Sequence, residues 1–345
     1  MSYSKPMSYP VIKCLLEHLD PNLRFKLALS CPLIKNLEKL VHLHIKYLKL
    51  TDHSITINKD TYQFTVHNTK NGFLHDIDER DELDLSPIHE DPNELIIDVR
   101  KNIRWYFRAA NVSSENTIQL KIGDKFEILR YRRKMHEALK YLLGKLFEGK
   151  TVKVNHLTIK CGNVIRILST VKFRVKILEV LDENTYDELD TIRSIIQTSS
   201  LPLNVETFRF LQAPVSRHEL IRTAGMLEIR CSIDVHTLAT LNHRRVHAPY
   251  FYEWRSNCFV DFLEIWMEYG KEIGSYYTFN IFEHRIDKAM KRIRKMYKRS
   301  VEAGSARRAG QLTLNMNNSS QLVISKVKQG DAWILGVEVK DRMVL

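Results

Sequence analysis

The sequence has no long apolar run, and its cysteines form no recognisable pairs. No stretch approaches the ~20 apolar residues that a helix needs to cross a bilayer, and the opening MSYSKPMSYP lacks the apolar centre of a secretory signal. The five cysteines lie far apart without a C-x-x-C pair: Cys14, Cys31, Cys161, Cys231 and Cys258. These absences argue against a membrane span, a zinc site and a disulfide framework, and predict reduced core cysteines in a cytoplasmic or nuclear protein.

The motifs of common enzyme classes are missing as well. The chain contains no G-x-G-x-x-G, no G-x-S-x-G and no H-E-x-x-H. His243 and His247 have the spacing of two metal ligands on one helical face, but Arg244 and Arg245 lie between them. Because neighbouring cations oppose the binding of a divalent metal, we expect no metal site, no cofactor and no catalytic residues, and a protein that is not an enzyme.

One enzyme motif does have a match in the sequence, but the elements predicted on either side of it are in the wrong order. Residues 144–151 read GKLFEGKT, which fits the phosphate-binding loop G-x-x-x-x-G-K-[ST]. That loop works between a buried strand and a following helix. Here residues 125–147 have apolar side chains at helical spacing, the following TVKVNHLTIKC alternates like a strand, and Gly149 stands where a helix would stop. We therefore interpret the match as accidental.

The formal net charge of +12 is unevenly distributed. Residues 76–98 carry ten acidic side chains against Arg80 alone, which predicts a solvated loop. Residues 285–308 carry ten Lys or Arg against two acids, with an apolar stripe at helical spacing that includes Ile286, Met290 and Ile293. We favour a helix that packs through this stripe and exposes its charges, and consider nucleic-acid binding unlikely because stacking aromatics are absent.

An alternative function for the same tract stays open. Its cations could bind RNA or another polyanion, or an anionic membrane surface. The residues for this alternative are Lys291, Arg292, Arg294, Lys295, Lys298 and Arg299.

The first forty residues have the pattern of three short helices. Ile12, Leu15, Leu16 and Leu19 share one helical face, and Asp20-Pro21 then provides a cap and a first-turn proline. A second helix carrying Leu23 and Leu27 is ended by Pro32, which starts a third. So small a unit cannot bury all of these leucines, so some must be covered by the rest of the chain or by a partner.

Short strands dominate the remaining sequence. SITINKDTYQFTVHN predicts a hairpin, and TIQLKIG predicts a further strand. From residue 152 onward, alternating strands recur every ~20–30 residues with helical segments between them, a spacing typical of a leucine-rich-repeat-like solenoid. An ordinary α/β layer is the competing interpretation. The predicted fold class is α+β or α/β, with a small helical unit ahead of a repeat-like domain.

Several stretches resemble a known family. SYPVIKCLLEHLDPNLRFKLALSCP resembles an F-box, and SITINKDTYQF, KYLLGKLFEGKTVKVNHLTI, SSLPLNVETF and FVDFLEIWMEYGKEIGSYYTFNIF are similar to the F-box C family, which is expanded in nematodes and has a C-terminal domain of unknown function. The similarity covers nearly the whole chain.

This resemblance implies a substrate receptor of a Skp–cullin–F-box ubiquitin ligase. Residues 1–48 would form the F-box-like unit, 49–150 a linker hairpin with acidic loop and basic helix, and 151–345 the domain that holds a target protein. The side chains expected to bind the Skp-type adaptor are Pro10, Leu15, Leu16, Leu19, Leu23 and Leu27. For each leucine, packing inside the chain's own core is the competing interpretation.

Overall fold

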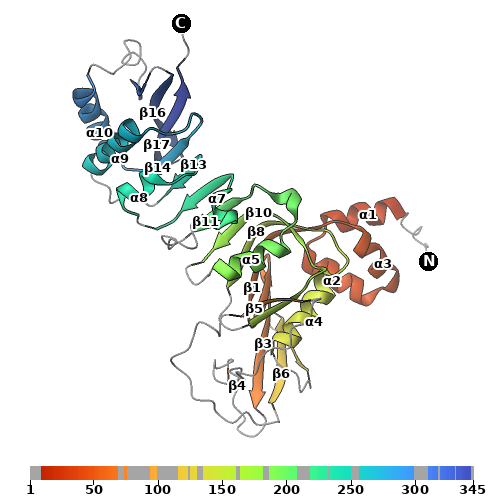
Figure 1. Cartoon of the computed structure of the whole chain (residues 1–345). Coiled ribbons are helices and arrows are strands. Elements are labelled where there is room, and N and C mark those ends of the chain that lie inside the picture. The colour runs from red at the N-terminus through yellow and green to blue at the C-terminus, as the bar shows by residue number, and fades with distance from the viewer. Residues whose placement is uncertain are drawn as a thin grey trace. The chain divides into compact units, whose positions relative to one another are not determined.

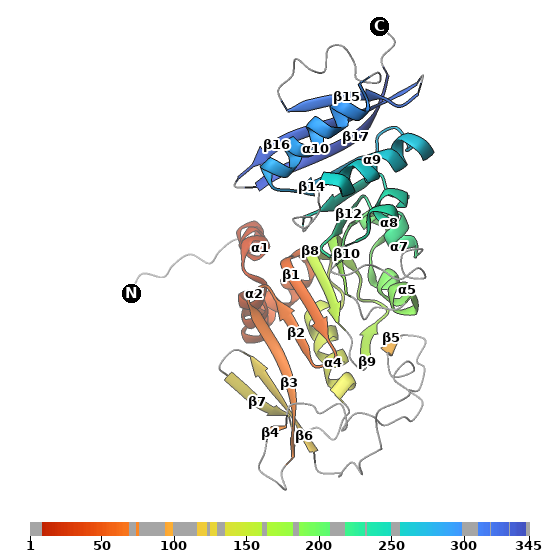
Figure 2. The same ribbon diagram turned by 90° about the vertical axis from the view of Figure 1, so that its left-hand side faces the viewer.

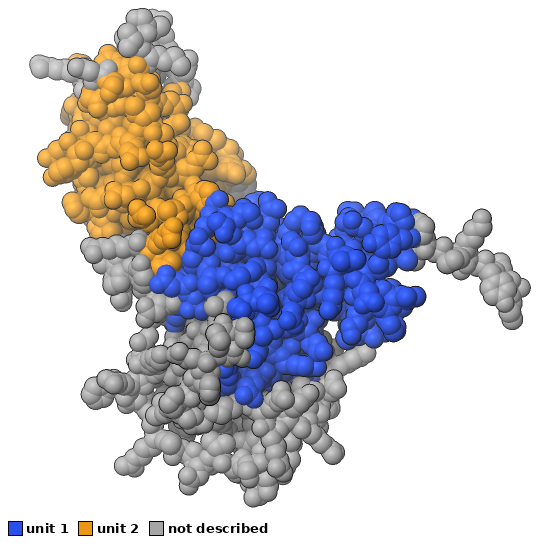
Figure 3. All heavy atoms as spheres, turned by 45° about the vertical axis from the view of Figure 1, so that its right-hand side comes forward, with its two compact units in different colours: residues 1–201 blue, residues 202–345 orange. Residues whose placement is uncertain are grey.

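The computed structural model describes residues 9–68, 74–75, 94–98, 116–122, 125–129, 135–160, 164–181, 186–207, 218–231, 233–249, 256–298, 310–317, 319–330 and 332–342. Most of the acidic stretch, Cys161 and Arg299 lie outside these ranges. The chain divides into two compact units, Met1–Leu201 and Pro202–Leu345, which Figure 3 colours separately. Each unit is described by itself below.

Unit 1 begins with three helices, as the sequence predicts. They are α1 (Tyr9–His18), α2 (Pro21–Ser30) and α3 (Pro32–Leu40), and they lie together beside the strands of the unit (Figure 1). The Asp20 side chain caps α2 by accepting a hydrogen bond from the N–H of Asn22 at 2.9 Å. Pro21 and Pro32 occupy first-turn positions, where a missing N–H costs nothing.

The sheet of unit 1 combines a parallel and an antiparallel part. Its strands are β1 (Leu43–Thr51), β2 (Ser54–Ile57), β3 (Asp60–Asn68), β6 (Asn116–Ile122), β7 (Lys125–Leu129), β8 (Val152–Lys160) and β10 (Phe173–Val180). They follow the order β10-β8-β1-β2-β3-β6-β7, with β10, β8 and β1 parallel and the others antiparallel. The short β4 (Leu74–His75) pairs with β3. The predicted hairpin of β2 and β3 is confirmed, and the predicted strand TIQLKIG is β6.

Two helices and a small ribbon complete unit 1. They are α4 (Met135–Phe147), α5 (Tyr186–Ile195), a 3₁₀ turn η2 (Thr198–Ser200), and the two-stranded ribbon of β5 (Glu94–Asp98) and β9 (Val164–Leu168). The prediction of one helix across 125–147 is wrong in its first part, because Lys125–Leu129 pairs with β6 as strand β7. Apolar spacing alone could not reveal this edge pairing, because a short apolar run fits both periods.

The sheet of unit 2 also combines a parallel and an antiparallel part. The strands β11 (Asn204–Thr207), β12 (Met226–Ile229), β13 (Arg245–Ala248) and β14 (Tyr276–Asn280) run parallel in chain order. The strands β15 (Gln311–Asn315), β16 (Ser320–Gln329) and β17 (Ala332–Asp341) form an antiparallel meander that joins β14 through β17.

Helices α7 (Glu219–Arg222), α8 (Val235–Thr240), α9 (Ser256–Tyr269) and α10 (Glu283–Met296) connect or follow the parallel strands. α9 and α10 pack against each other over this sheet (Figure 2). The core below α9 is aromatic: Phe262 and Trp266 contact Tyr277 of β14, with ring centroids 6.0 and 4.8 Å away. The chain is therefore a mixed α/β protein with an N-terminal helical segment.

Candidate partner-binding surface

The three N-terminal helices expose an unusual amount of apolar side chain. Of the 14 large apolar side chains that are exposed in the described ranges, seven belong to residues 9–40. These seven define the helical apolar surface: Tyr9, Val11, Leu15, Leu23, Leu29, Leu33 and Leu40. Leu29 and Leu33 are 84% and 79% exposed. Large exposed apolar patches on proteins are often sites of interaction with another molecule.

The six residues expected to meet an adaptor have different environments. Leu15 and Leu23 are exposed, at 43% and 47%, and Pro10 is exposed as well. Leu19 and Leu27 are half-buried. Leu16, only 1% exposed, belongs to the core of the unit.

Five members of the helical apolar surface were not among the predicted contact residues: Tyr9, Val11, Leu29, Leu33 and Leu40. The sequence contained a signal for them, because three helices of nine or ten residues with so many leucines cannot bury them all. In α3 the buried position is taken by Glu38, which is 2% exposed, while Leu33 and Leu40 are exposed. Likewise Cys14, predicted to lie in the core, is exposed.

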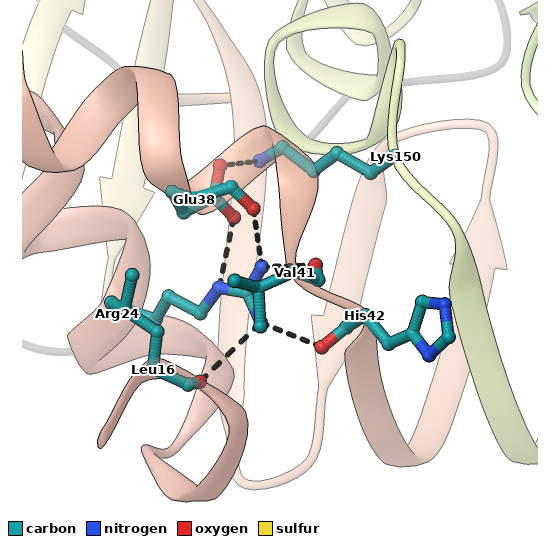
Figure 4. A network of polar contacts seen from close by, with 6 residues as sticks. All are labelled: Leu16, Arg24, Glu38, Val41, His42 and Lys150. Carbon is teal, nitrogen blue, oxygen red and sulfur yellow. Dashed lines mark hydrogen bonds and ion pairs between the residues drawn. The ribbon is translucent and has the colours of Figure 1, made fainter. Parts of the chain in front are cut away.

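A buried arginine explains why these leucine side chains are exposed. Arg24 of α2 is 1% exposed, and all five of its N–H donors are used. Its Nε donates to Oε1 of Glu38 at 3.1 Å. Its two terminal nitrogens donate to four backbone carbonyls, those of Leu16, Glu38, Val41 and His42 (Figure 4).

These carbonyls lie at the ends of two helices. Leu16 is in the last turn of α1, while Glu38 and Val41 end α3. The last carbonyls of a helix lack the regular partner within the helix. Arg24 donates to such carbonyls at the ends of both helices and, through the His42 carbonyl, ties them to the start of β1. The helical segment is therefore held by polar bonds at its centre, while five of its leucines are exposed: Leu15, Leu23, Leu29, Leu33 and Leu40.

Lys150 completes this group, which we call the Arg24 cluster (Arg24, Glu38 and Lys150). Its Nζ lies 2.7 Å from Oε2 of Glu38, with the lysine side chain 4% exposed (Figure 4). It also lies 4.8 Å from the ring centroid of Phe25. Burial lowers the pKa of Lys150, and the hydrogen bond to Glu38 raises it in part.

Lys150 is the lysine of the GKLFEGKT match. The segment runs from α4 into β8, and Gly149 has the left-handed φ of 73° that ends a helix. Both features confirm the predicted helix-to-strand order. The lysine side chain is directed at a carboxylate inside the unit, which supports the interpretation that the phosphate-loop match is accidental.

A second set of polar contacts fixes α2 to the hairpin. The Asn22 side chain donates to the Ile57 carbonyl at 3.1 Å and accepts from the Tyr62 hydroxyl at 2.9 Å. Burial raises the pKa of Tyr62 to about 12. The helical segment is thus bonded to the sheet at two places, and its orientation on unit 1 is defined by side chains rather than by leucine packing alone.

The basic tract of unit 2 forms α10, and its predicted apolar stripe is confirmed for Ile286, Met290 and Ile293, which are buried. The two acids of α10, Glu283 and Asp287, bind Lys326 of β16 at 3.0 and 2.7 Å. Five cations are exposed and have no ion-pair partner among the described residues: Lys288, Lys291, Arg294, Lys295 and Lys298. Arg292 donates to the side-chain oxygen of Asn257, and Arg299 lies outside the described ranges.

His243 and His247 do not share a helical face. His243 lies after α8, where its Nε2 donates to the Ile221 carbonyl at 2.6 Å. His247 is in β13, and its Nδ1 lies 2.8 Å from the Thr278 hydroxyl. Among the residues that the structure describes, no group of three or more His, Cys, Asp or Glu side chains is arranged to hold a metal ion.

A hollow of about 520 Å³ in unit 2 is lined by a lysine whose pKa is lowered by burial. Lys271 donates to the carbonyls of Ala239 and Leu241, and its Nζ lies 5.5 Å from the ring centroid of Trp266. Burial lowers the pKa of Lys271 to about 8, although the Glu272 carboxylate raises it in part.

We expect acylation of Lys271 to have its half-maximal rate near pH 8, because only the neutral amine is a nucleophile. A reference lysine in a short unstructured peptide should still be gaining reactivity above pH ~9, because the ordinary pKa of lysine is ~10.4. Pulse labelling with acetic anhydride across this range, read by peptide mass spectrometry, measures both profiles. Coinciding profiles for the two lysines would contradict this expectation.

Comparison with known proteins gives one match. No curated protein and no solved structure matches the chain. Within the described ranges, no helix has both the length and the apolar character required to span a membrane. Residues 134–283, from just before α4 to the start of α10, match the family described as Domain of unknown function (DUF3557), so the chain contains this domain, with the helices of residues 9–40 N-terminal to it.

Proposed function

We propose that the protein is a substrate-recognition subunit of a Skp–cullin–F-box type ubiquitin ligase. In this proposal α1, α2 and α3 are an F-box-like hook, and the DUF3557-containing part holds the target protein. The protein itself would act without catalysis, in the cytoplasm or nucleus. The observation that carries the proposal is the helical apolar surface, which is exposed over three successive helices.

The physical argument concerns the free energy of covering that surface. Burial of apolar area contributes about 25 cal/mol per Å² before the costs of association. A specific interface buries about 800 Å² on each partner, an area that three neighbouring helices can provide. Because the Arg24 cluster already orders these helices, binding would not require them to fold first, and less entropy would be lost.

Target recognition would use the parallel strands and the segments that join them. Strands β8 and β10 in unit 1, and β11 to β14 in unit 2, follow one another in parallel with helical segments between most of them. This regularity supports the leucine-rich-repeat-like interpretation, in which side chains along repeated strands bind a protein.

The deciding experiment is co-expression of the full chain with a Skp-type adaptor, followed by size-exclusion chromatography. We expect a stable complex containing one copy of each protein. Recovery of the two proteins in separate peaks, with the chain still folded by circular dichroism, would refute the proposal.

A second candidate function rests on α10. Its exposed cations have no ion-pair partner among the described residues, as a polyanion-binding helix requires. Under this alternative, a single-stranded RNA or an anionic vesicle would bind the chain, and affinity would fall steeply with added salt. Replacing Arg292, Arg294 and Lys295 with Glu would remove this binding. Anisotropy or vesicle co-sedimentation that is unaffected by the triple variant would dismiss the candidate.

A further inference from the structure

A groove lies in unit 1 between α2 and α3 on one side and α4 with strands β3 and β6 on the other. Its volume is about 560 Å³, within the ~300–1,000 Å³ typical of ligand sites. The walls are mainly apolar and include Phe25, Phe64, Leu120 and Leu146, all buried against the unit. The groove is thus a preformed apolar slot beside the helical apolar surface, with which it shares the side chain of Leu29.

Lysines from three different helices line this groove. Lys26 comes from α2, Lys35 and Lys39 from α3, and Lys145 from α4. All four are exposed, and none has a carboxylate partner among the described residues. The Nζ of Lys145 lies 5.1 Å from the ring centroid of Tyr141.

The acids that line the groove do not neutralise these charges. Glu38 is already bound by Arg24 and Lys150. Glu137 is the other carboxylate of the lining, against the four exposed lysines that also line the groove.

We propose that this groove binds a short acidic peptide segment, in which one or two large apolar side chains are flanked by Asp or Glu. The apolar side chains would enter the slot between Phe25 and Leu146. The flanking carboxylates would pair with lysines on either side of it, which raises affinity and selects against neutral or basic sequences. This activity goes beyond the proposed function, because it requires neither an adaptor nor the exposed leucines of α1.

The distribution of the lysines favours a peptide over a small anionic amphiphile. A fatty acid carries one carboxylate and would use one or two cations at one end of the slot. The groove instead has lysines on both α3 and α4, on opposite sides of the apolar walls. Lys35 and Lys39 are four residues apart and so share one face of α3, where they can bind two carboxylates of an extended chain.

The test uses the full chain and a fluorescein-labelled peptide with the sequence Asp-Glu-Leu-Phe-Glu-Asp, measured by fluorescence anisotropy. Two control peptides replace the acids by Asn and Gln, or Leu and Phe by Ser. We expect saturable binding of the acidic apolar peptide and at least about tenfold weaker binding of either control, equivalent to ~1.4 kcal/mol. Affinity should also fall with salt.

Reversing the charge of two lysines distinguishes binding in this groove from nonspecific attraction of an acidic peptide to a basic protein. The double variant Lys35→Glu with Lys39→Glu should weaken peptide binding at least about tenfold. The control, Lys291→Glu with Lys295→Glu on α10, makes the same change of charge in unit 2 and should leave peptide binding unchanged. Both pairs are exposed, so folding should be retained, which circular dichroism checks. Lys145→Glu provides a single-site variant on the opposite wall and should weaken binding as well.

Three outcomes would overturn the proposal. The peptide could fail to bind at ~100 μM, far above the micromolar range of ordinary peptide grooves. The two double variants could lose binding equally, which would assign it to net charge. Laurate could bind with the same dependence on Lys35 and Lys39 while the peptide does not, which would assign the groove to an anionic amphiphile.

Discussion

Replacing Arg24 with Met lowers the free energy of unfolding of unit 1 by about 3–5 kcal/mol, the range for breaking a buried ion pair by removing one partner. The methionine fills much of the same volume but donates no hydrogen bond. Three backbone carbonyls at the ends of α1 and α3, and that of His42 just before β1, lose the arginine donor, and the Glu38 carboxylate keeps its ion pair with Lys150. Urea denaturation of the full chain, followed by circular dichroism, measures the change.

The matched control for this prediction is Lys26→Met. Lys26 lies two residues along α2, is exposed, and has no ion-pair partner among the described residues. Its replacement should change the free energy of unfolding by no more than ~0.5 kcal/mol, as is usual for surface positions. Equal effects of the two substitutions would show that Arg24 does not organise the helices.

The double substitution Leu23→Asp with Leu33→Asp reduces affinity for a Skp-type adaptor at least about 100-fold. Two apolar anchors of an interface are lost, each worth ~2 kcal/mol or more when it is a hot spot, and two carboxylates would have to be desolvated. Because the two leucines are 47% and 79% exposed, the cost to folding should be small. Isothermal titration calorimetry with the purified adaptor measures the affinity.

The control places the same chemical change in unit 2. Met296 and Val327 are also exposed, at 46% and 53%, and both are replaced with Asp. Their adaptor affinity should equal that of the unchanged chain. The interpretation of α1 to α3 as an adaptor-binding hook fails if the two double variants bind equally well.

The elements that could be predicted from the sequence are those with strong local signals. Asp20-Pro21 and Pro32 define helix starts, and the structure places α2 and α3 at these prolines. The hairpin of β2 and β3 follows from alternating apolar residues on either side of a predicted turn at Lys59 and Asp60. The structure has the turn one residue earlier, at Asn58 and Lys59. Here Asn58 adopts a positive φ of 57°, a conformation that asparagine tolerates.

The features that local patterns missed depend on contacts between distant parts of the chain. Arg24 and Glu38 are 14 residues apart, and Lys150 joins them from after α4. No periodicity indicates that three charged residues will occupy the interior while Leu29 and Leu33 remain outside. The same reason applies to β7, whose pairing with β6 outweighs its helical apolar spacing.

The sequence therefore predicted where in the chain the candidate site lies, but not which of its side chains are exposed. The shortage of core for so many leucines correctly pointed to exposed apolar surface in the first forty residues. Arg24 binds carbonyls at the ends of α1 and α3, and these bonds fix which face of each helix points into the unit. Leu16 is consequently inside, while Leu40 is 69% exposed.

Hydrogen–deuterium exchange of the full chain, with and without a Skp-type adaptor, tests most directly whether the helices of residues 9–40 form the binding surface. We predict slower exchange on adding the adaptor in peptides from α1, α2 and α3, and no change in peptides from α9 and α10. Unaltered exchange throughout residues 9–40 at saturating adaptor, or protection confined to unit 2, would contradict this account.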